Sequence, residues 1–319
     1  MGFPQVIATF HVMYDVIGLP GNLLVIQTII LESRFHVMRY ILLASLALSD
    51  FLLLILVNSF RIGSIAQEHL LYGETMCYLN PFFARYFYIN TVFHLVAVSY
   101  DRYLAIVRSP LTYDGAITKT RGVFMALIWI IPSPLSIDLL LGWGQSFYNP
   151  EVFHCEPGWA EQSSSSTRKM IVILIATAIM PVPFLVIVFL NVHVYRTAKR
   201  QINAIEAQVG GHGDAVSSQQ QEMSRRFRAD RKAAIDVAII IAAFLVCLLP
   251  GWAMSICQKF VPSIDVPAGA VLVAKCVFFL SAICNPVIYF IRKREFRNAV
   301  KKMLRQIGVC QDSNDNDIV

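Results

Sequence analysis

The chain has 319 residues, of which 56% are hydrophobic and only 15% are charged. Soluble domains carry about 45–50% apolar and about 25% charged residues, so this composition excludes an ordinary soluble enzyme. A membrane core takes about 20 apolar residues per helical crossing. We therefore expect a compact protein that crosses a membrane several times.

Long apolar stretches, separated by charged or Gly/Pro-rich connections, predict seven membrane-spanning helices. The stretches cover residues 5–31, 39–63, 76–107, 121–142, 169–195, 233–257 and 268–291. They lack the strict alternation of β-barrel strands, and helices satisfy their own backbone groups in lipid. The fold class is therefore predicted to be an all-α membrane protein, with a seven-helix bundle over residues 1–291.

Basic residues gather in the connections after the first, third and fifth stretches and after the seventh. Arg34, Lys199, Arg225 and Arg292 are examples. The positive-inside rule places these connections in the cytoplasm, with the N-terminus extracellular and the C-terminus cytoplasmic. We expect a plasma-membrane protein, and the net charge of +6 then requires no nucleic-acid partner.

Three segments outside the spans differ from them in composition and in expected structure. The inner loop at about residues 201–229 is expected to be flexible and residues 309–319 to form a disordered tail. Residues 292–308 place apolar side chains at helical spacing among Lys and Arg, which predicts a short amphipathic helix on the membrane surface. Cys310 follows this helix and is a candidate for palmitoylation, with an unmodified thiol as the alternative. The final residues, Asp317 to Val319, fit a PDZ-type partner.

Two cysteines stand on the predicted outer side of the membrane. Cys77 opens the third span, and Cys155 lies in the loop between the fourth and fifth spans. The remaining cysteines lie within or near helices or in the tail. Because the outer face is oxidising, we predict a Cys77–Cys155 disulfide that holds the loop over the bundle.

Polar and proline motifs recur in a fixed order along these spans. They are Gly21-Asn22, Asp50 at the end of LALSD, Asp101-Arg102-Tyr103, Trp129, Pro183, Cys247-Leu248-Leu249-Pro250 and Asn285-Pro286-Val287-Ile288-Tyr289. Over nearly the whole chain this order resembles the rhodopsin-like (class A) G-protein-coupled receptors, in their amine and opsin branch. The resemblance implies a receptor that activates a heterotrimeric G protein, with arrestin and a receptor kinase as candidate further partners.

The resemblance also implies a switch at the cytoplasmic end. We expect Arg102 to contact Asp230 in the resting state and to lose that contact as the sixth helix swings outward. The alternative is a solvated surface pair worth about 0–1 kcal/mol. Leu111 matches the residue that family members insert into the G protein. The other expected coupling residues are Asp101, Tyr103, Asn285, Pro286 and Tyr289.

Asp50 is an ionisable residue inside a span, and such residues are usually functional. The surrounding polar residues resemble the family's sodium and water pocket, so we expect a Na⁺ site at Asp50. No cofactor is expected to be required. The alternative is a protonated carboxyl that only holds helices together. The expected pocket residues are Asn22, Asp50, Thr91, Ser281 and Asn285.

An aromatic relay is expected below the ligand site. Phe244 retains the family's aromatic residue and would work with Pro183 and Val92. Leu248 stands where the family carries its toggle tryptophan. Activation would then depend less on an aromatic rotamer, and we predict elevated basal activity.

The ligand-binding residues depart from both branches. Ala84 replaces the aspartate that pairs with amine ligands, which disfavours a monoamine bound in the usual way. Phe279 replaces the opsin lysine, and Lys275 lies one turn closer to the outside. Retinal is therefore not expected, although an opsin-like photoreceptor with a shifted lysine stays as one alternative. A small-solute transporter is the other, but no internal repeat is visible.

The outer halves of the spans carry bases and acids that are expected either to pair with one another or to bind ligand. The bases are Arg61, Arg85 and Lys275, and the acids are Asp15 and Asp138. Buried charges need partners, so the acids are expected to neutralise the bases. In the alternative, Arg85 or Lys275 captures a carboxylate or phosphate of a small ligand. Tyr88, Trp252 and Phe279 would line that pocket.

Overall fold

The computed structural model describes residues 3–70, 73–108, 113–137, 140, 145–158, 181–210, 218–260 and 266–306. The elements are mostly helices, joined by short turns and one two-stranded sheet. The helices are α1 (Phe3–Leu31), α2 (Met38–Leu53), α3 (Ser59–Gln67), α4 (Gly73–Tyr103), α5 (Lys119–Ile130), α7 (Pro181–Gly210), α8 (Ser218–Phe260), α9 (Ala268–Arg292) and α10 (Arg294–Gln306). A 3₁₀ turn covers Ser33–Phe35, and π-helical turns cover Leu54–Asn58 and Leu104–Arg108.

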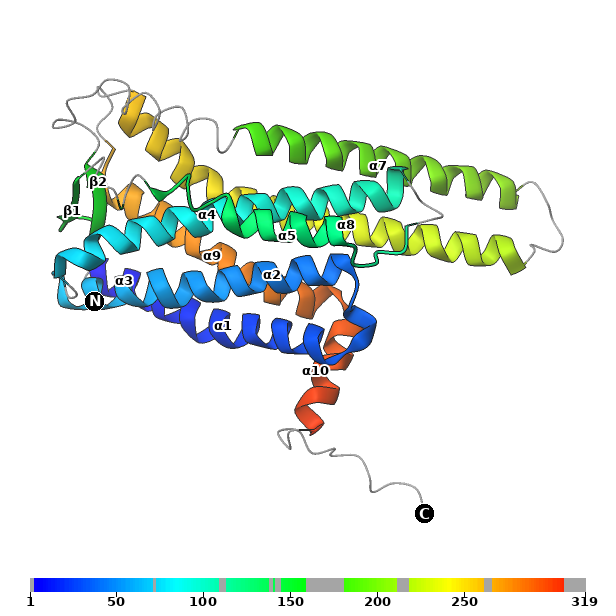
Figure 1. The fold of residues 1–319 in the computed structure, drawn as a ribbon, viewed down its shortest axis with the longest axis horizontal. Coiled ribbons are helices and arrows are strands. Elements are labelled where there is room, and N and C mark those ends of the chain that lie inside the picture. Colours follow the sequence, from blue (N-terminus) through cyan, green and yellow to red (C-terminus); the bar gives the residue numbers. More distant parts are fainter. Residues whose placement is uncertain are drawn as a thin grey trace, which may run out of the picture.

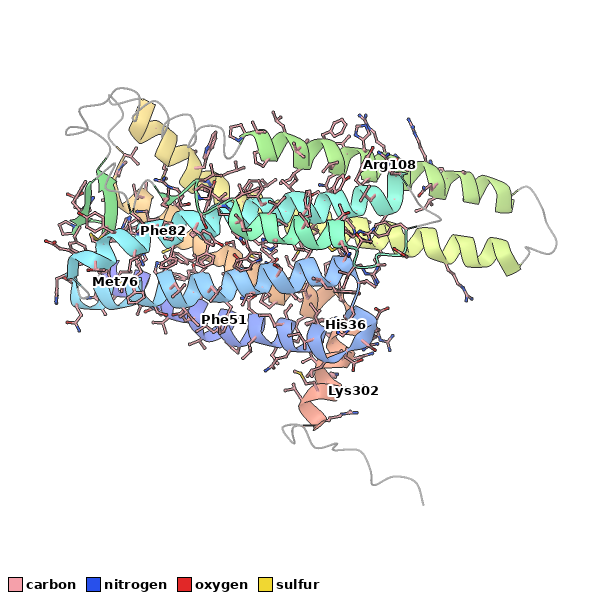
Figure 2. All side chains as sticks on the ribbon, viewed as in Figure 1. His36, Phe51, Met76, Phe82, Arg108 and Lys302 are labelled. Atoms are coloured by element: carbon pink, nitrogen blue, oxygen red, sulfur yellow. A yellow bond between two sulfur atoms is a disulfide. The ribbon has the colours of Figure 1, made fainter. Side chains whose placement is uncertain are left out.

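The long helices lie roughly side by side in one elongated bundle (Figure 1). Strands β1 (Gln145–Asn149) and β2 (His154–Gly158) pair antiparallel at one end, with Tyr148 opposite Cys155. Helix α10 leaves the bundle at the opposite end. We call these the disulfide end and the α10 end. Figure 2 shows Met76 near the former and His36, Arg108 and Lys302 toward the latter.

Five segments of the described residues are long and apolar enough to cross a membrane. They are Pro4–Leu31, Met38–Gln67, Pro181–Ala204, Ile235–Met254 and Ala268–Arg292. The second runs continuously through α2, the π-helical turn and α3. Helices α4 and α5 lie beside these segments in the same bundle, as predicted for the third and fourth spans (Figure 1).

The fourth helix is shorter than predicted. Its expected range was 121–142, but α5 ends at Ile130 and residues 131–136 form turns. Pro132 and Pro134 explain the difference, because a proline lacks the backbone N–H that an α-helix needs and clashes with the preceding turn. The first part of the predicted fifth span, residues 169–180, lies outside the described residues.

The inner loop is shorter than expected because both flanking helices continue into it. Helix α7 ends only at Gly210, and α8 already begins at Ser218. Both extend beyond the rest of the bundle at the α10 end (Figure 1). Gln, Glu, Arg and Ala are frequent in these extensions, and all are good helix formers. The helices thus take up most of the expected loop at 201–229, and residues 211–217 lie outside the described residues.

Helix α1 lies very close to α9 and to the α2 segment. A Cβ atom added at Gly21 would lie 3.0 Å from Cβ of Pro286, and one at Gly18 would lie 2.5 Å from Cδ1 of Leu54. These two glycines therefore permit the close approach of the helix backbones. Toward the α10 end, the largest apolar cluster joins α2, α4, α8 and α9, with Phe244 fully buried in it.

The predicted amphipathic helix is present as α10, two residues shorter than expected at each end. Lys293 interrupts the helix with an extended backbone. Phe296 and Val300 are buried against the bundle, and Lys302 donates a 2.8 Å hydrogen bond to Glu32, directly after α1. This bond lowers the pKa of the Glu32 carboxyl. Helix α10 is thus fixed to both α9 and the end of α1.

Candidate functional site

A buried ion pair occupies the α10 end of α4. Both Asp101 and Arg102 are about 5% exposed, and the Nε and Nη2 atoms of Arg102 donate to Oδ2 of Asp101. The hydroxyl of Tyr113 donates to the other carboxylate oxygen. Burial, followed by this contact with Asp101, raises the pKa of the Tyr113 hydroxyl. The guanidinium of Arg102 is therefore held by its neighbour on the same helix.

The other expected coupling residues have different outcomes. The side chain of Asp230 and all of Leu111 lie outside the described residues, so the predicted Arg102–Asp230 contact stays a prediction. Tyr103 packs against a small apolar cluster of Ala105, Ile106, Val194 and Ala198. Further along α8, Asp236 accepts a 2.6 Å hydrogen bond from Nε of Arg292 on α9.

Around Lys293 the α10 end carries several charges. Burial lowers the pKa of the Lys293 ammonium to about 8, and the nearby Asp236 carboxylate partly opposes this shift. The Lys293 ammonium also lies 5.5 Å from the ring centre of Tyr40. Lys293 thus lies near the Asp236–Arg292 pair at the junction of α9 and α10.

In the middle of the bundle, Asp50 is 1% exposed. Its Oδ2 accepts a 2.7 Å hydrogen bond from Nδ2 of Asn285 on α9. Asn22 donates instead to the backbone oxygens of Gly18 and Ala282, and Ser281 donates to Phe278. The structure thus brings Asp50 and Asn285 together directly, while Asn22 and Ser281 bond to backbone oxygens.

Several buried oxygens at this level fit a cation or water. Among the described residues, Oδ1 of Asp50, Oδ1 of Asn22 and Oδ1 of Asn285 have no hydrogen-bond partner. Unsatisfied buried oxygens are costly, and hard cations prefer oxygen ligands. Thr91, the remaining expected pocket residue, is 3% exposed on α4. The donor set therefore suits Na⁺ with water, and sodium binding at Asp50 stays a prediction.

Most of the expected relay is packed together. Val92, Phe244 and Leu248 are buried members of the largest apolar cluster, and Trp252 packs against the same cluster. Pro183 lies on α7, only half-buried, and is not a member of that cluster. Tyr289 is 2% exposed, and its ring lies 6.2 Å from that of Phe296.

At the disulfide end, basic side chains lie beneath β2. The Nζ atom of Lys275 lies 3.2 Å from Nδ1 of His154, and the guanidinium of the buried Arg61 lies 6.0 Å from the ring centre of Phe279. A cavity of about 20 Å³ lies here. A volume of that size can hold a water molecule. It is lined by Arg61, Ser64, Asn80 and His154 together with Phe60, Leu70, Met76, Phe153 and Cys155.

Asp15 on α1 has polar neighbours on the α2 segment. Nδ2 of Asn58 donates to it at 2.7 Å and the hydroxyl of Ser59 at 3.2 Å. Asn58 is also paired with the buried ring of His11. Asp138 lies outside the described residues, so its expected pairing stays a prediction. Three expected pocket residues lie on α4. Ala84 packs against the second apolar cluster, the ring of Tyr88 lies 6.0 Å from that of Phe278, and Arg85 is half-buried.

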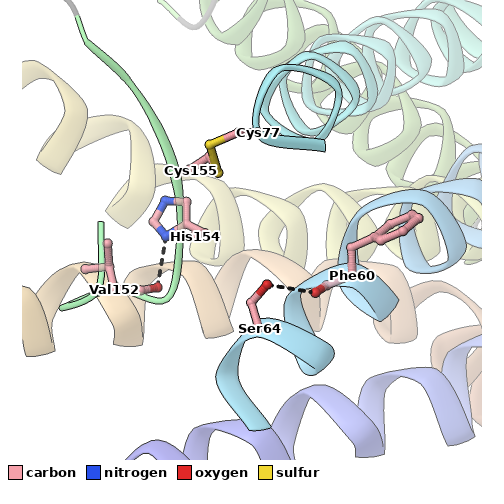
Figure 3. Close-up of a disulfide and its surroundings, with 6 residues drawn as sticks. All are labelled: Phe60, Ser64, Cys77, Val152, His154 and Cys155. Carbon is pink, nitrogen blue, oxygen red and sulfur yellow. Dashed lines mark hydrogen bonds between the residues drawn. A yellow bond between two sulfur atoms is a disulfide. The ribbon is translucent and has the colours of Figure 1, made fainter. Parts of the chain in front are cut away.

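The predicted disulfide is present. Cys77 at the start of α4 is bonded to Cys155 in β2, across 78 residues of sequence. Figure 3 shows His154 next to this bond, with Ser64 and Phe60 on the facing segment. Cys155 and the neighbouring His154 thus line the cavity at the disulfide end.

Sequence reasoning missed three buried polar contacts. They are His11 with Asn58, Trp129 and His94 with Ser45, and Arg292 with Asp236. Each involves a polar residue within or at the edge of a predicted span, where such residues are rare. Their pairing could not be inferred, because it depends on how the helices are rotated.

Comparison with known proteins identifies the family. The profile described as "7 transmembrane receptor (rhodopsin family)" matches residues 21–289. This chain belongs to the rhodopsin family of seven-transmembrane receptors. It is accordingly a multi-pass membrane protein and not an enzyme. The match confirms the predicted seven-helix bundle and does not favour the transporter alternative.

The relatives are receptors of the amine branch. Trace amine-associated receptor 9 of Rattus norvegicus is 30% identical over 300 residues, which cover 91% of this chain and 86% of the relative. Octopamine receptor beta-2R of Chilo suppressalis is 26% identical over 304 residues, which cover 89% of this chain and 75% of the relative. Squid rhodopsin has a similar fold, with a TM-score of 0.83 at 18% identity over 98% of this chain and 88% of that chain.

Proposed function

We propose that this protein receives a small-molecule signal outside the plasma membrane and activates a heterotrimeric G protein inside it. The disulfide end would face the exterior, because disulfides persist in oxidising compartments. The α10 end would face the cytoplasm, because basic residues gather in the connections there. Family membership supports this proposal.

The observation that carries the proposal is the buried Asp101–Arg102 pair. A switch needs an element with two arrangements, and a charge held in a dry site by one neighbour has a second, released arrangement available to it. Outward movement of α8 would open the α10 end and free Arg102 for the G protein. Asp230 is proposed to restrain the resting state, and Leu111 is proposed to contact the G protein.

Sodium is proposed to bind beside Asp50 and to favour the resting arrangement. Asp50 and Asn285 would supply carboxylate and amide oxygens, with Asn22, Thr91 and Ser281 completing the polar surroundings. The bound cation would neutralise the buried carboxylate. Adding NaCl in place of choline chloride should raise the melting temperature of the wild type and leave that of Asp50→Asn unchanged.

The relay supports a second proposal, elevated basal activity. Leu248 presents no aromatic ring to turn beneath a ligand, so Phe244 and Val92 would carry the rearrangement alone. We also propose arrestin, a receptor kinase and a PDZ-type protein as partners, and palmitoylation of Cys310. The chain beyond residue 306 lies outside the described residues.

For the ligand, we propose a carboxylate or phosphate group captured by Arg85 or Lys275. Ala84 leaves no carboxylate at the position where the relatives' family pairs an amine. At least one of Arg85→Gln and Lys275→Gln should then lose the response to an acidic agonist while keeping its basal activity. An amine agonist that activates the wild type and Arg85→Gln equally would contradict this ligand class.

The main experiment measures nucleotide exchange. Purified protein in lipid nanodiscs would be mixed with each class of Gα subunit with Gβγ, and GTP uptake would be followed with no ligand and with amine and carboxylate panels. We expect uptake above that of empty nanodiscs, lost in Arg102→Leu and kept in Arg34→Gln. Uptake equal to empty nanodiscs with every Gα class and every panel would contradict the proposal.

A further inference from the structure

We propose that the Asp236–Arg292 ion pair is a latch that holds α8 against α9 at the α10 end. This inference rests on the proposed function, because it assigns what keeps the sixth helix closed before activation. Nε of Arg292 donates to Oδ1 of Asp236 at 2.6 Å. The two residues lie on different helices, so the bond must break when α8 moves away from α9.

The burial of the two partners differs. The side chain of Asp236 is only 6% exposed, whereas that of Arg292 is 35% exposed. A buried carboxylate without its cation is strongly disfavoured. With Arg292 in place the closed arrangement is favoured, and without it α8 gains by carrying Asp236 out to water. The latch therefore depends on Arg292 as much as on the acid.

Arg292 belongs to a fixed frame. It ends α9, which packs against α1, and α10 follows after Lys293. Helix α10 is in turn bonded to the end of α1 through Lys302 and Glu32. Arg292 is therefore held in place by α1, α9 and α10. When the two sides separate, we expect α8 to be the helix that moves.

The latch is distinct from the expected Arg102–Asp230 restraint. Asp236 lies six residues after Asp230 in the sequence. Asp236 faces α9, while the Arg102 guanidinium on α4 is bonded to Asp101.

The apolar packing beside the latch is extensive but not directional. Val237, Ile240 and Ile241 on α8 belong to the same buried cluster as Tyr289 on α9. Such contacts can slide, whereas a charge-assisted hydrogen bond fixes both distance and direction. The ion pair therefore sets the register of α8 against α9.

The test measures the separation of α8 from the frame, with no ligand and no G protein. Spin labels would be attached to cysteines placed at the exposed positions Arg225 on α8 and Ser33 after α1, in nanodiscs. We expect Asp236→Asn and Arg292→Gln each to raise the ratio of long to short distances roughly tenfold, as expected for loss of a charge-assisted hydrogen bond. The reversed pair, Asp236→Arg with Arg292→Asp, should return most of the population to the short distance.

Arg294→Gln is the matched control, because it removes an exposed arginine two residues away and should leave the distances unchanged. Unchanged distances in both single variants would overturn the latch, as would a reversed pair as open as the single variants. Nucleotide exchange on the same samples separates the two proposals. Longer distances without increased exchange would leave the latch standing and count against the proposed function.

Discussion

Gly18 offers a sharp test of how closely α1 approaches the α2 segment. In Gly18→Ala, the added methyl group would lie 2.5 Å from Cδ1 of Leu54 and 3.1 Å from Cγ2 of Ile283. Leu54 is fully buried, so it has little room to withdraw. Overpacking of this kind costs about 1–3 kcal/mol.

The intrinsic preference of helices for alanine opposes this cost. Replacing glycine by alanine inside a helix gains about 1 kcal/mol, so the net loss in Gly18→Ala is about 0–2 kcal/mol. Gly122→Ala is the matched control, because a Cβ at Gly122 in α5 has open space around it. The two variants should therefore differ by about 1–3 kcal/mol. At roughly 2–4 °C per kcal/mol, their melting temperatures in detergent should differ by about 2–12 °C.

A second substitution identifies the cause. Leu54→Ala alone should destabilise by about 2–5 kcal/mol, because it empties a buried site. In the Gly18→Ala background it should cost about 1–3 kcal/mol less, since the clash disappears with the side chain. A melting temperature for Gly18→Ala at or above that of Gly122→Ala would refute the close approach, as would simple additivity with Leu54→Ala.

Three further predictions concern other parts of the molecule. Cys155→Ser should lower stability by about 2–5 kcal/mol, and a reductant should then destabilise the wild type but not the variant. Ser45→Ala should cost about 1–3 kcal/mol, because the buried ring nitrogens of Trp129 and His94 lose their shared partner; an unchanged melting temperature would argue against this contact. The pKa of Lys293 falls from 10.5 to about 8 on folding, so the unfolded chain binds more protons between these values and stability should rise with pH across that window. Lys293→Met should remove this rise, as measured by melting temperatures from pH 7 to pH 10.

Much of the fold could be predicted because membrane burial leaves a strong local signal. A span of about 20 apolar residues must be helical, and the Cys77–Cys155 bond followed from which side of the membrane each cysteine faces. Helix ends were less predictable. The fourth span ended early at Ile130, where two prolines follow, and α7 and α8 continued into the expected loop because their polar residues still favour helix.

Those parts of the site could be predicted in which a single residue is recognisable by its chemistry. The contact of Asp50 with Asn285 could be expected, since an ionisable residue in a span needs a polar partner. The pair of Asp236 and Arg292 could not be predicted, because it depends on how α8 and α9 are rotated about their axes. No sequence pattern fixes that rotation. Likewise, the position of Lys275 beside His154 depends on how β2 is held by the disulfide.

The π-helical turn at Leu54–Asn58 changes which residues face the interior beyond it. A π-helical turn contains one extra residue, so the side chains after it are rotated by about 100° around the helix axis relative to a regular α-helix. In a regular α-helix Asn58 would point about 80° away from Asp50, whereas the turn brings the two directions within about 20° of each other. Deleting Ile55 would undo this offset and rotate Asn58, Arg61 and Ser64 together. The polar lining of the disulfide end thus depends on the number of residues in this turn as well as on their identity.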